Sequence, residues 1–124
     1  MWGVMSVTNL RTMNNYAKGR AFEYRVKKAL EERGYYVIRS AGSHSITDLL
    51  AFDSKCRIYL IQCKYGKARL SKEEKTKIIE TLKKFPRLTF LLVVNEGGLT
   101  FYRLEVKNDR KTKRSLVIKR LNSY

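Results

Sequence analysis

An acid, an amide and an ammonium group stand at spacings that could bring them together at one edge of a sheet. Asp48 begins one apolar β-type segment, and Gln62 and Lys64 end the next one. Strand side chains alternate between faces, so Gln62 and Lys64 point to the same side while Cys63 points away. A hairpin would bring Asp48 beside this pair. Such a cluster could hold a divalent ion, through its oxygens, against a phosphate.

Each of these residues also has an ordinary structural explanation. Asp48 could be a turn residue that opens the strand, and Lys64 could be a solvated strand end. Gln62 is harder to explain in this way, because it is the only glutamine of the chain and interrupts an apolar run. A buried amide needs hydrogen-bond partners, which a functional cluster would supply. The spacing alone leaves both explanations open.

The composition favours a polyanionic partner. Lys and Arg number 27 against 11 Asp and Glu, which gives a formal charge of +16. A small domain with so much like charge repels itself, so nucleic acid is the favoured partner. An anionic membrane surface comes second, and a merely soluble basic protein third. The 44% hydrophobic content is enough for a folded core.

We expect the chain to form a single domain in the cytoplasm. It contains no apolar run long enough to span a membrane and no signal-peptide pattern at its start. We expect residues 1–13 to form a flexible N-terminal tail and residues 14–124 to form one domain. Cys56 and Cys63 lie seven apart in one expected strand, on opposite faces, so we expect neither a disulfide nor a metal pair.

Hydrophobic periodicity gives the order of the elements. Apolar positions at helical spacing predict a helix over Asn15–Arg33 that ends at Gly34. A second helix begins at Ser71, where Ser71 and Glu74 have capping-box spacing, and ends before Pro86. The expected strands are Tyr35–Arg39, Asp48–Phe52, Arg57–Lys64, Thr89–Val94, Leu99–Leu104 and Ser115–Leu121. A loop over Ser40–Thr47 and a charged turn over Lys107–Arg114 complete the order α-β-β-β-α-β-β-β, typical of an α/β domain whose mixed central sheet is flanked by helices.

Four blocks of sequence resemble a known family. Asp48 followed by Gln62-Cys63-Lys64 is similar to the signature of the PD-(D/E)xK nucleases, in the variant in which the middle acid is glutamine. The stretches 18–23 (KGRAFE), 34–43 (GYYVIRSAGS) and 48–51 (DLLA) further resemble motifs of the archaeal Holliday junction resolvase family. The four blocks occur in the family's order over residues 16–104, which is far more specific than any one motif. The resemblance implies a restriction-endonuclease-like core.

The resemblance also implies a reaction and the residues that carry it. The expected activity is that of a Mg²⁺-dependent, structure-selective DNA endonuclease, with Mn²⁺ as a possible substitute, that resolves four-way junctions during recombination and repair. Asp48 and Glu23 would bind the metal together with the Gln62 side chain and the Cys63 carbonyl. Lys64 would act on the attacking water or the phosphate. Ser43 would complete the catalytic set by contacting the scissile phosphate or ordering its loop.

Basic residues near these blocks are the expected DNA contacts. They lie on the first helix, in the first strand and in the loop that follows Lys64: Lys18, Arg20, Arg39, Lys67, Arg69 and Lys72. Symmetric cutting of a junction needs two active sites, so we also expect a two-fold homodimer. Leu82, Phe85 and strand 89–94 are the candidate surfaces for pairing. Tyr35, Tyr36, Tyr59 and Phe85 are otherwise expected in the core.

Gln62 leaves alternatives open, because it removes one negative charge from the expected metal site. The chain could instead be a restriction- or repair-type nuclease that cuts duplex or flap DNA. It could also be a non-catalytic DNA-binding module that keeps the nuclease scaffold. The known activity of other glutamine variants in the superfamily favours an enzyme.

Overall fold

Two helices and six strands lie in the part of the chain that the structure, a computed structural model, describes: residues 15–40, 47–108 and 114–121. Strand order follows the sequence, and every neighbouring pair is antiparallel except β3 and β4, which are parallel. The predicted order of elements is confirmed. The elements are α2 (Asn15–Glu32), β1 (Tyr36–Arg39), β2 (Leu49–Phe52), β3 (Ile58–Lys64), α3 (Lys72–Lys84), β4 (Thr89–Asn95), β5 (Leu99–Asn108) and β6 (Arg114–Arg120).

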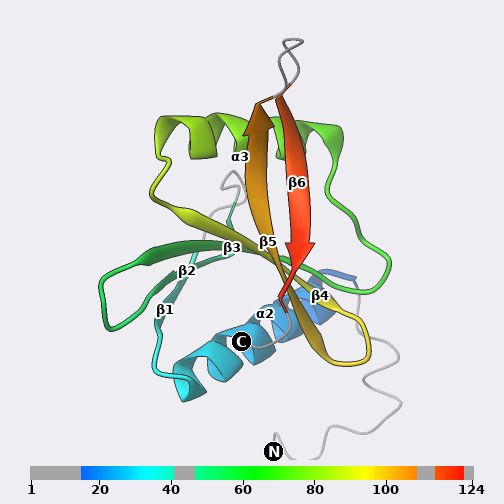
Figure 1. Cartoon of the computed structure of the whole chain (residues 1–124). Helices are drawn as coiled ribbons and strands as arrows, with labels where there is room; N and C mark the ends of the chain where they lie inside the picture. Colours follow the sequence, from blue (N-terminus) through cyan, green and yellow to red (C-terminus); the bar gives the residue numbers. More distant parts are fainter. Residues whose placement is uncertain (1–14, 41–46, 109–113, 122–124) are drawn as a thin grey trace, which may run out of the picture.

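The two helices cover opposite faces of this sheet (Figure 1). Phe22, Val26 and Leu30 form the apolar stripe of α2 and are fully buried against one face. Ile78 and Leu82 of α3 are buried against the other face. Alternate residues of the central strands supply both cores, which explains why β3 and β4 are apolar along most of their length. The ends of β2 and β3, where the expected site lies, are therefore placed between the layers formed by α2 and α3.

The ends of the helices match the sequence signals. Ser71 accepts a hydrogen bond from the Glu74 amide and Glu74 accepts one from the Ser71 amide, so the predicted capping box is present. Gly34 follows α2 with a φ of +92°, a conformation that favours glycine after a helix. Because β3 and β4 are parallel, α3 must run back across the sheet between them. Its N-terminus consequently begins near the end of β3.

The turn between β2 and β3 is held by Asp53. Its carboxylate accepts hydrogen bonds from the backbone amides of Lys55 and Arg57, each at 2.9 Å. Burial opposes ionisation, but these bonds and those from the Arg57 and Tyr59 side chains lower the pKa of Asp53 to about 2. Cys56 lies in this turn with a φ of +61°, so its expected place in the strand was wrong. Both cysteines are free, as predicted.

Several other expectations need correction. β5 and β6 extend into the predicted 107–114 turn, of which only residues 109–113 lie outside the described part. The predicted tail, 1–13, also lies outside it. Tyr36 and Phe85 are 69% and 53% exposed rather than core residues. β4 pairs with strands on both sides and Leu82 is buried, so neither can form a dimer surface.

Neither helix of the described chain is long and apolar enough to cross a bilayer.

Candidate active site at the end of β3

Asp48 lies beside the end of β3, as the hairpin argument predicts. Leu49 pairs with Ile61 in the antiparallel register, which sets Asp48 opposite Gln62. The Asp48 amide donates to the Ile61 carbonyl at 2.8 Å, and its Oδ2 accepts from the Cys63 amide at 2.7 Å. The carboxylate is thus held at the backbone between Gln62 and Lys64. Asp48, Gln62 and Lys64 therefore lie close together, as expected.

Asp48 is held in a partly buried, electrostatically mixed environment. Burial is the main cause that raises the pKa of its carboxyl group, and the negative charge of Glu74 adds to the rise. The Cys63 amide and the positive charges of Lys64 and Arg39 act in the opposite direction. An acid with a raised pKa in such a place needs a positive partner to keep its charge, and a bound cation would be one.

Glu23 reaches the same region from α2. It pairs with Arg39 of β1, with 3.0 Å between Arg39 Nε and Glu23 Oε1. Burial raises the pKa of Glu23, and the nearby charge of Asp48 raises it further, while Arg39 lowers it. Asp48 is therefore close enough for its charge to affect the ionisation of Glu23. Arg39 also lies 5.8 Å from the centre of the Tyr24 ring. In this structure Arg39 is the positively charged partner of Glu23.

Gln62 is the least exposed polar residue of the site, at 7%. Its Nε2 donates to Glu74 Oε2 at 2.8 Å. Its Oε1 is buried and accepts no hydrogen bond from the residues that the structure describes. A buried acceptor without a donor is costly, and a bound cation or water would satisfy it.

Glu74 is a neighbour of Gln62 and Lys64 that the sequence did not predict. Its carboxylate lies 2.9 Å (Oε2) and 3.0 Å (Oε1) from Lys64 Nζ, in addition to its bond with Gln62. Burial raises its pKa, but hydrogen bonds from the Ser71 amide and Lys64 outweigh this effect, so the pKa is lowered. The capping-box spacing places Glu74 only within its helix, whereas its position beside Gln62 and Lys64 depends on the return of α3 to the end of β3.

The donor set fits a hard divalent cation in an open site. Residues 15–40, 47–108 and 114–121 contain no group of three or more His, Cys, Asp or Glu placed to hold a metal. Asp48 and Glu23 nevertheless supply carboxylate oxygens in one region, and Gln62 supplies a buried amide oxygen that has no donor among these described residues. Oxygen ligands with places left for water are what Mg²⁺ prefers.

A basic pocket of about 480 Å³ opens beside Lys64. The loop after β3 lines it with Lys67 and Arg69, and α3 adds Lys75, which was not among the expected contacts. Lys72 is exposed at the first position of α3. The pocket follows directly on the candidate active site, as the position of the 65–70 loop predicts. It has the charge to take a phosphate backbone.

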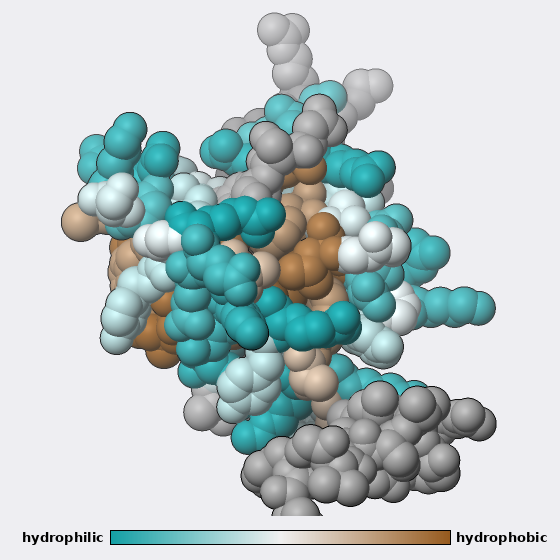
Figure 2. All heavy atoms as spheres, turned by 90° about the horizontal axis from the view of Figure 1, so that it is seen from below, coloured by the Kyte–Doolittle hydropathy of each residue, from teal (hydrophilic) through white to brown (hydrophobic). Residues whose placement is uncertain are grey.

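The other expected contacts are spread more widely. Arg20 is exposed on α2 and Lys18 is half-buried. Figure 2, which views the molecule from below, shows a largely hydrophilic surface with smaller hydrophobic areas between. Ser43 lies outside the described residues.

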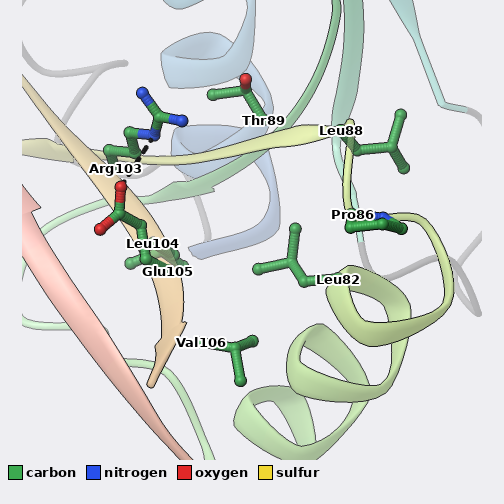
Figure 3. Close-up of a pocket in the computed structure, with 8 residues that line it drawn as sticks. All are labelled: Leu82, Pro86, Leu88, Thr89, Arg103, Leu104, Glu105 and Val106. Atoms are coloured by element: carbon green, nitrogen blue, oxygen red, sulfur yellow. Dashed lines mark ion pairs between the residues drawn. The ribbon is translucent and has the colours of Figure 1, made fainter. Parts of the chain in front are cut away.

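A second pocket, of about 200 Å³, lies elsewhere (Figure 3). It lies between the end of α3 and β5 and is bordered by the ion pair of Arg103 with Glu105. Its wall contains Leu82, Leu88 and Val106 and none of the expected site residues. We assign it no role in catalysis.

Fold and site together define a class of protein: a nuclease with a restriction-endonuclease-like core, with Asp48 just before β2, Lys64 at the end of β3 and Glu23 on α2. Comparison with known proteins gives the family. The model of the archaeal Holliday junction resolvase (Hjc) family matches residues 14–122, and the chain belongs to this family. It is therefore an enzyme, an endodeoxyribonuclease that acts on DNA and depends on a divalent metal.

Individual relatives agree with this assignment. The chain is 34% identical over 91 residues to the crossover junction endodeoxyribonuclease Hjc of Methanocaldococcus jannaschii, covering 71% of this chain and 67% of that protein. The solved structure of Archaeoglobus fulgidus Hjc, a Holliday junction resolvase from an archaeal hyperthermophile, matches with a TM-score of 0.58. That match covers 81% of this chain and 83% of the other at 21% identity, and it supports the fold.

Proposed function

We propose that this chain cuts four-way DNA junctions with Mg²⁺ at the site formed by Glu23, Asp48, Gln62 and Lys64. The observation that carries the proposal is the buried Gln62 oxygen, which has no hydrogen-bond donor within residues 15–40, 47–108 and 114–121, beside an acid held against the backbone of Cys63. The basic pocket next to Lys64 supports a phosphate-bearing substrate. Family membership supports the choice of a branched one.

The side chains divide the work of phosphodiester hydrolysis. Asp48, Glu23, the Gln62 oxygen and the Cys63 carbonyl are the proposed metal ligands. When bound, Mg²⁺ would acidify a water molecule and neutralise charge that develops on the phosphate. Lys64 Nζ donates hydrogen bonds to Glu74 in the free protein, and it can offer one to the attacking water or to a phosphate oxygen. The water oxygen forms the new bond to phosphorus as the bond to the leaving oxygen breaks.

Ser43 and Arg39 complete the proposed site. We expect Ser43 to contact the scissile phosphate or to order its loop. The Arg39 guanidinium pairs with Glu23 in this structure. Glu23 and a DNA phosphate would therefore compete for Arg39. If a metal takes over the charge of Glu23, Arg39 becomes available to a phosphate oxygen.

Symmetric cutting requires a second copy. A two-fold homodimer presents two equivalent sites, one for each of the opposed strands. Of the earlier candidates, Phe85 keeps an exposed ring that could contribute to such an interface.

A cleavage assay tests the proposed substrate. With Mg²⁺ we expect paired, symmetric nicks on a synthetic four-way junction and little cutting of linear duplexes made from its arms. Equal cutting of the linear DNA would favour a restriction- or repair-type nuclease. Binding of the junction without cleavage in either Mg²⁺ or Mn²⁺ would instead identify a DNA-binding module and overturn the proposal.

Replacing both Lys67 and Arg69 by glutamine tests the basic pocket. If both side chains neutralise phosphates, the plot of log affinity against log salt should become shallower by about 2. Junction affinity should fall most at low salt. The measurement is a binding titration in EDTA at several salt concentrations. The matched control is glutamine at Lys83 and Lys84, exposed at the far end of α3, which should leave the slope unchanged.

A further inference from the structure

Glu74 makes more contacts than a capping residue needs. The capping box uses its Oε1, which accepts from the Ser71 amide at 2.8 Å. Its Oε2 has a different role, because it accepts from Gln62 Nε2 at 2.8 Å and from Lys64 Nζ at 2.9 Å. One carboxylate thus joins the start of α3 to both functional side chains of β3.

The contact fixes which end of the Gln62 amide faces Glu74. An ionised carboxylate can only accept hydrogen bonds, so the amide nitrogen must point toward Glu74. The amide oxygen must then point away from Glu74, and it is this Oε1 that is buried and has no donor in the described part of the chain. Without Glu74 the amide could turn and present its nitrogen, which cannot bind a cation. Glu74 therefore makes Gln62 an oxygen donor.

The Glu74 carboxylate also supplies a negative charge that the site lacks because residue 62 is glutamine and not glutamate. A glutamate at position 62 would carry a negative charge two residues from Lys64. In this chain the charge comes instead from Glu74, 2.9 Å from Lys64 Nζ. The charge of Glu74 is also felt at Asp48, so it belongs to the electrostatic field of the site. Glu73, the preceding acid of the same helical turn, is exposed, and the Gln62 amide donates to Glu74.

We propose that Glu74 is a positioning residue that compensates for Gln62: it holds the amide with Oε1 toward the metal and supplies the missing negative charge beside Lys64. The inference rests on the proposed metal site and adds a residue from α3 to it.

Metal binding without DNA tests the inference. Calorimetric titration of the full chain with Mn²⁺ should show about 10–100-fold weaker binding for Glu74→Gln, since outer partners of metal ligands have effects of this size. Glu73→Gln removes the same charge from the same turn and should bind Mn²⁺ as the unaltered chain does. Unchanged binding by Glu74→Gln would overturn the inference.

A double variant separates this role from capping. Gln62→Glu in the Glu74→Gln background moves the acid from the helix to the strand, and Mn²⁺ affinity should return to within about threefold of the original. In the metal-free protein, Gln62→Glu alone should lower the melting temperature, because it sets two carboxylates against each other. Adding Glu74→Gln should reverse that loss. Failure of the double variant to recover metal binding would show that Glu74 matters only for the helix.

The side-chain amide itself gives an independent signal. Because Gln62 is the only glutamine, glutamine labelled with ¹⁵N yields one side-chain NH₂ pair in an NMR spectrum. Glu74→Ala should move this pair toward the position of a free amide and speed its hydrogen exchange, and Glu73→Ala should not. An unmoved pair would contradict the contact. If the unaltered chain binds no Mn²⁺ at all, the metal site itself fails, which is distinct from a failure confined to Glu74.

Discussion

Asp48→Asn should abolish junction cleavage, with a loss of at least about 10³-fold, equivalent to about 4 kcal/mol of transition-state stabilisation. The asparagine oxygen can still accept the hydrogen bond that Oδ2 now takes from the Cys63 amide. Its NH₂ group then occupies the place of the other carboxylate oxygen and cannot bind a cation. The substitution therefore removes a proposed metal ligand and a charge while it keeps the link to β3.

Two measurements make this result specific. Junction affinity in EDTA and the circular dichroism spectrum should match those of the unaltered chain. Glu80→Gln also removes one acid, from an exposed position on α3, and should cut at the normal rate. Cleavage by Asp48→Asn within tenfold of the original rate would show that Asp48 is not part of the active site. A general loss of folding would instead make it a structural residue of the hairpin.

Phe22→Ala should lower the free energy of unfolding by about 3–5 kcal/mol, the cost of removing a large buried side chain. Phe22 is fully buried between α2 and the sheet, and its ring centre lies 5.6 Å from that of Tyr65, just beyond β3. The cavity would also loosen the helix that carries Glu23. Urea unfolding, monitored by circular dichroism, measures the change.

An exposed aromatic residue provides the comparison. Phe85 is 53% exposed at the end of α3, and Phe85→Ala should cost less than about 1 kcal/mol. Equal losses for the two variants would contradict the packing of α2 against the sheet. Phe85 was expected in the core because an aromatic residue continued the apolar stripe of α3. Periodicity could not indicate that the sheet no longer lies beneath that position.

Sequence alone determined the features that depend on local rules. Alternation along a strand placed Gln62 and Lys64 on one side, and short spacings identified the capping box and the glycine that follows α2. Family motifs, read in order, indicated the class of enzyme and the restriction-endonuclease-like core. The position of Asp48 also followed, because a hairpin fixes which residues of two neighbouring strands lie opposite each other.

Only the tertiary structure decided the features that depend on how distant elements pack. The crossover of α3 between two parallel strands brings Glu74 back to Gln62 and Lys64, although the sequence indicated only a helix cap. The pairing of Arg39 with Glu23 requires α2 to lie beside β1. β4 pairs with β3 on one side and β5 on the other, so it is not available as a dimer surface. Local propensity fixes where a side chain points on its own element, whereas its partners depend on packing between elements far apart in the chain.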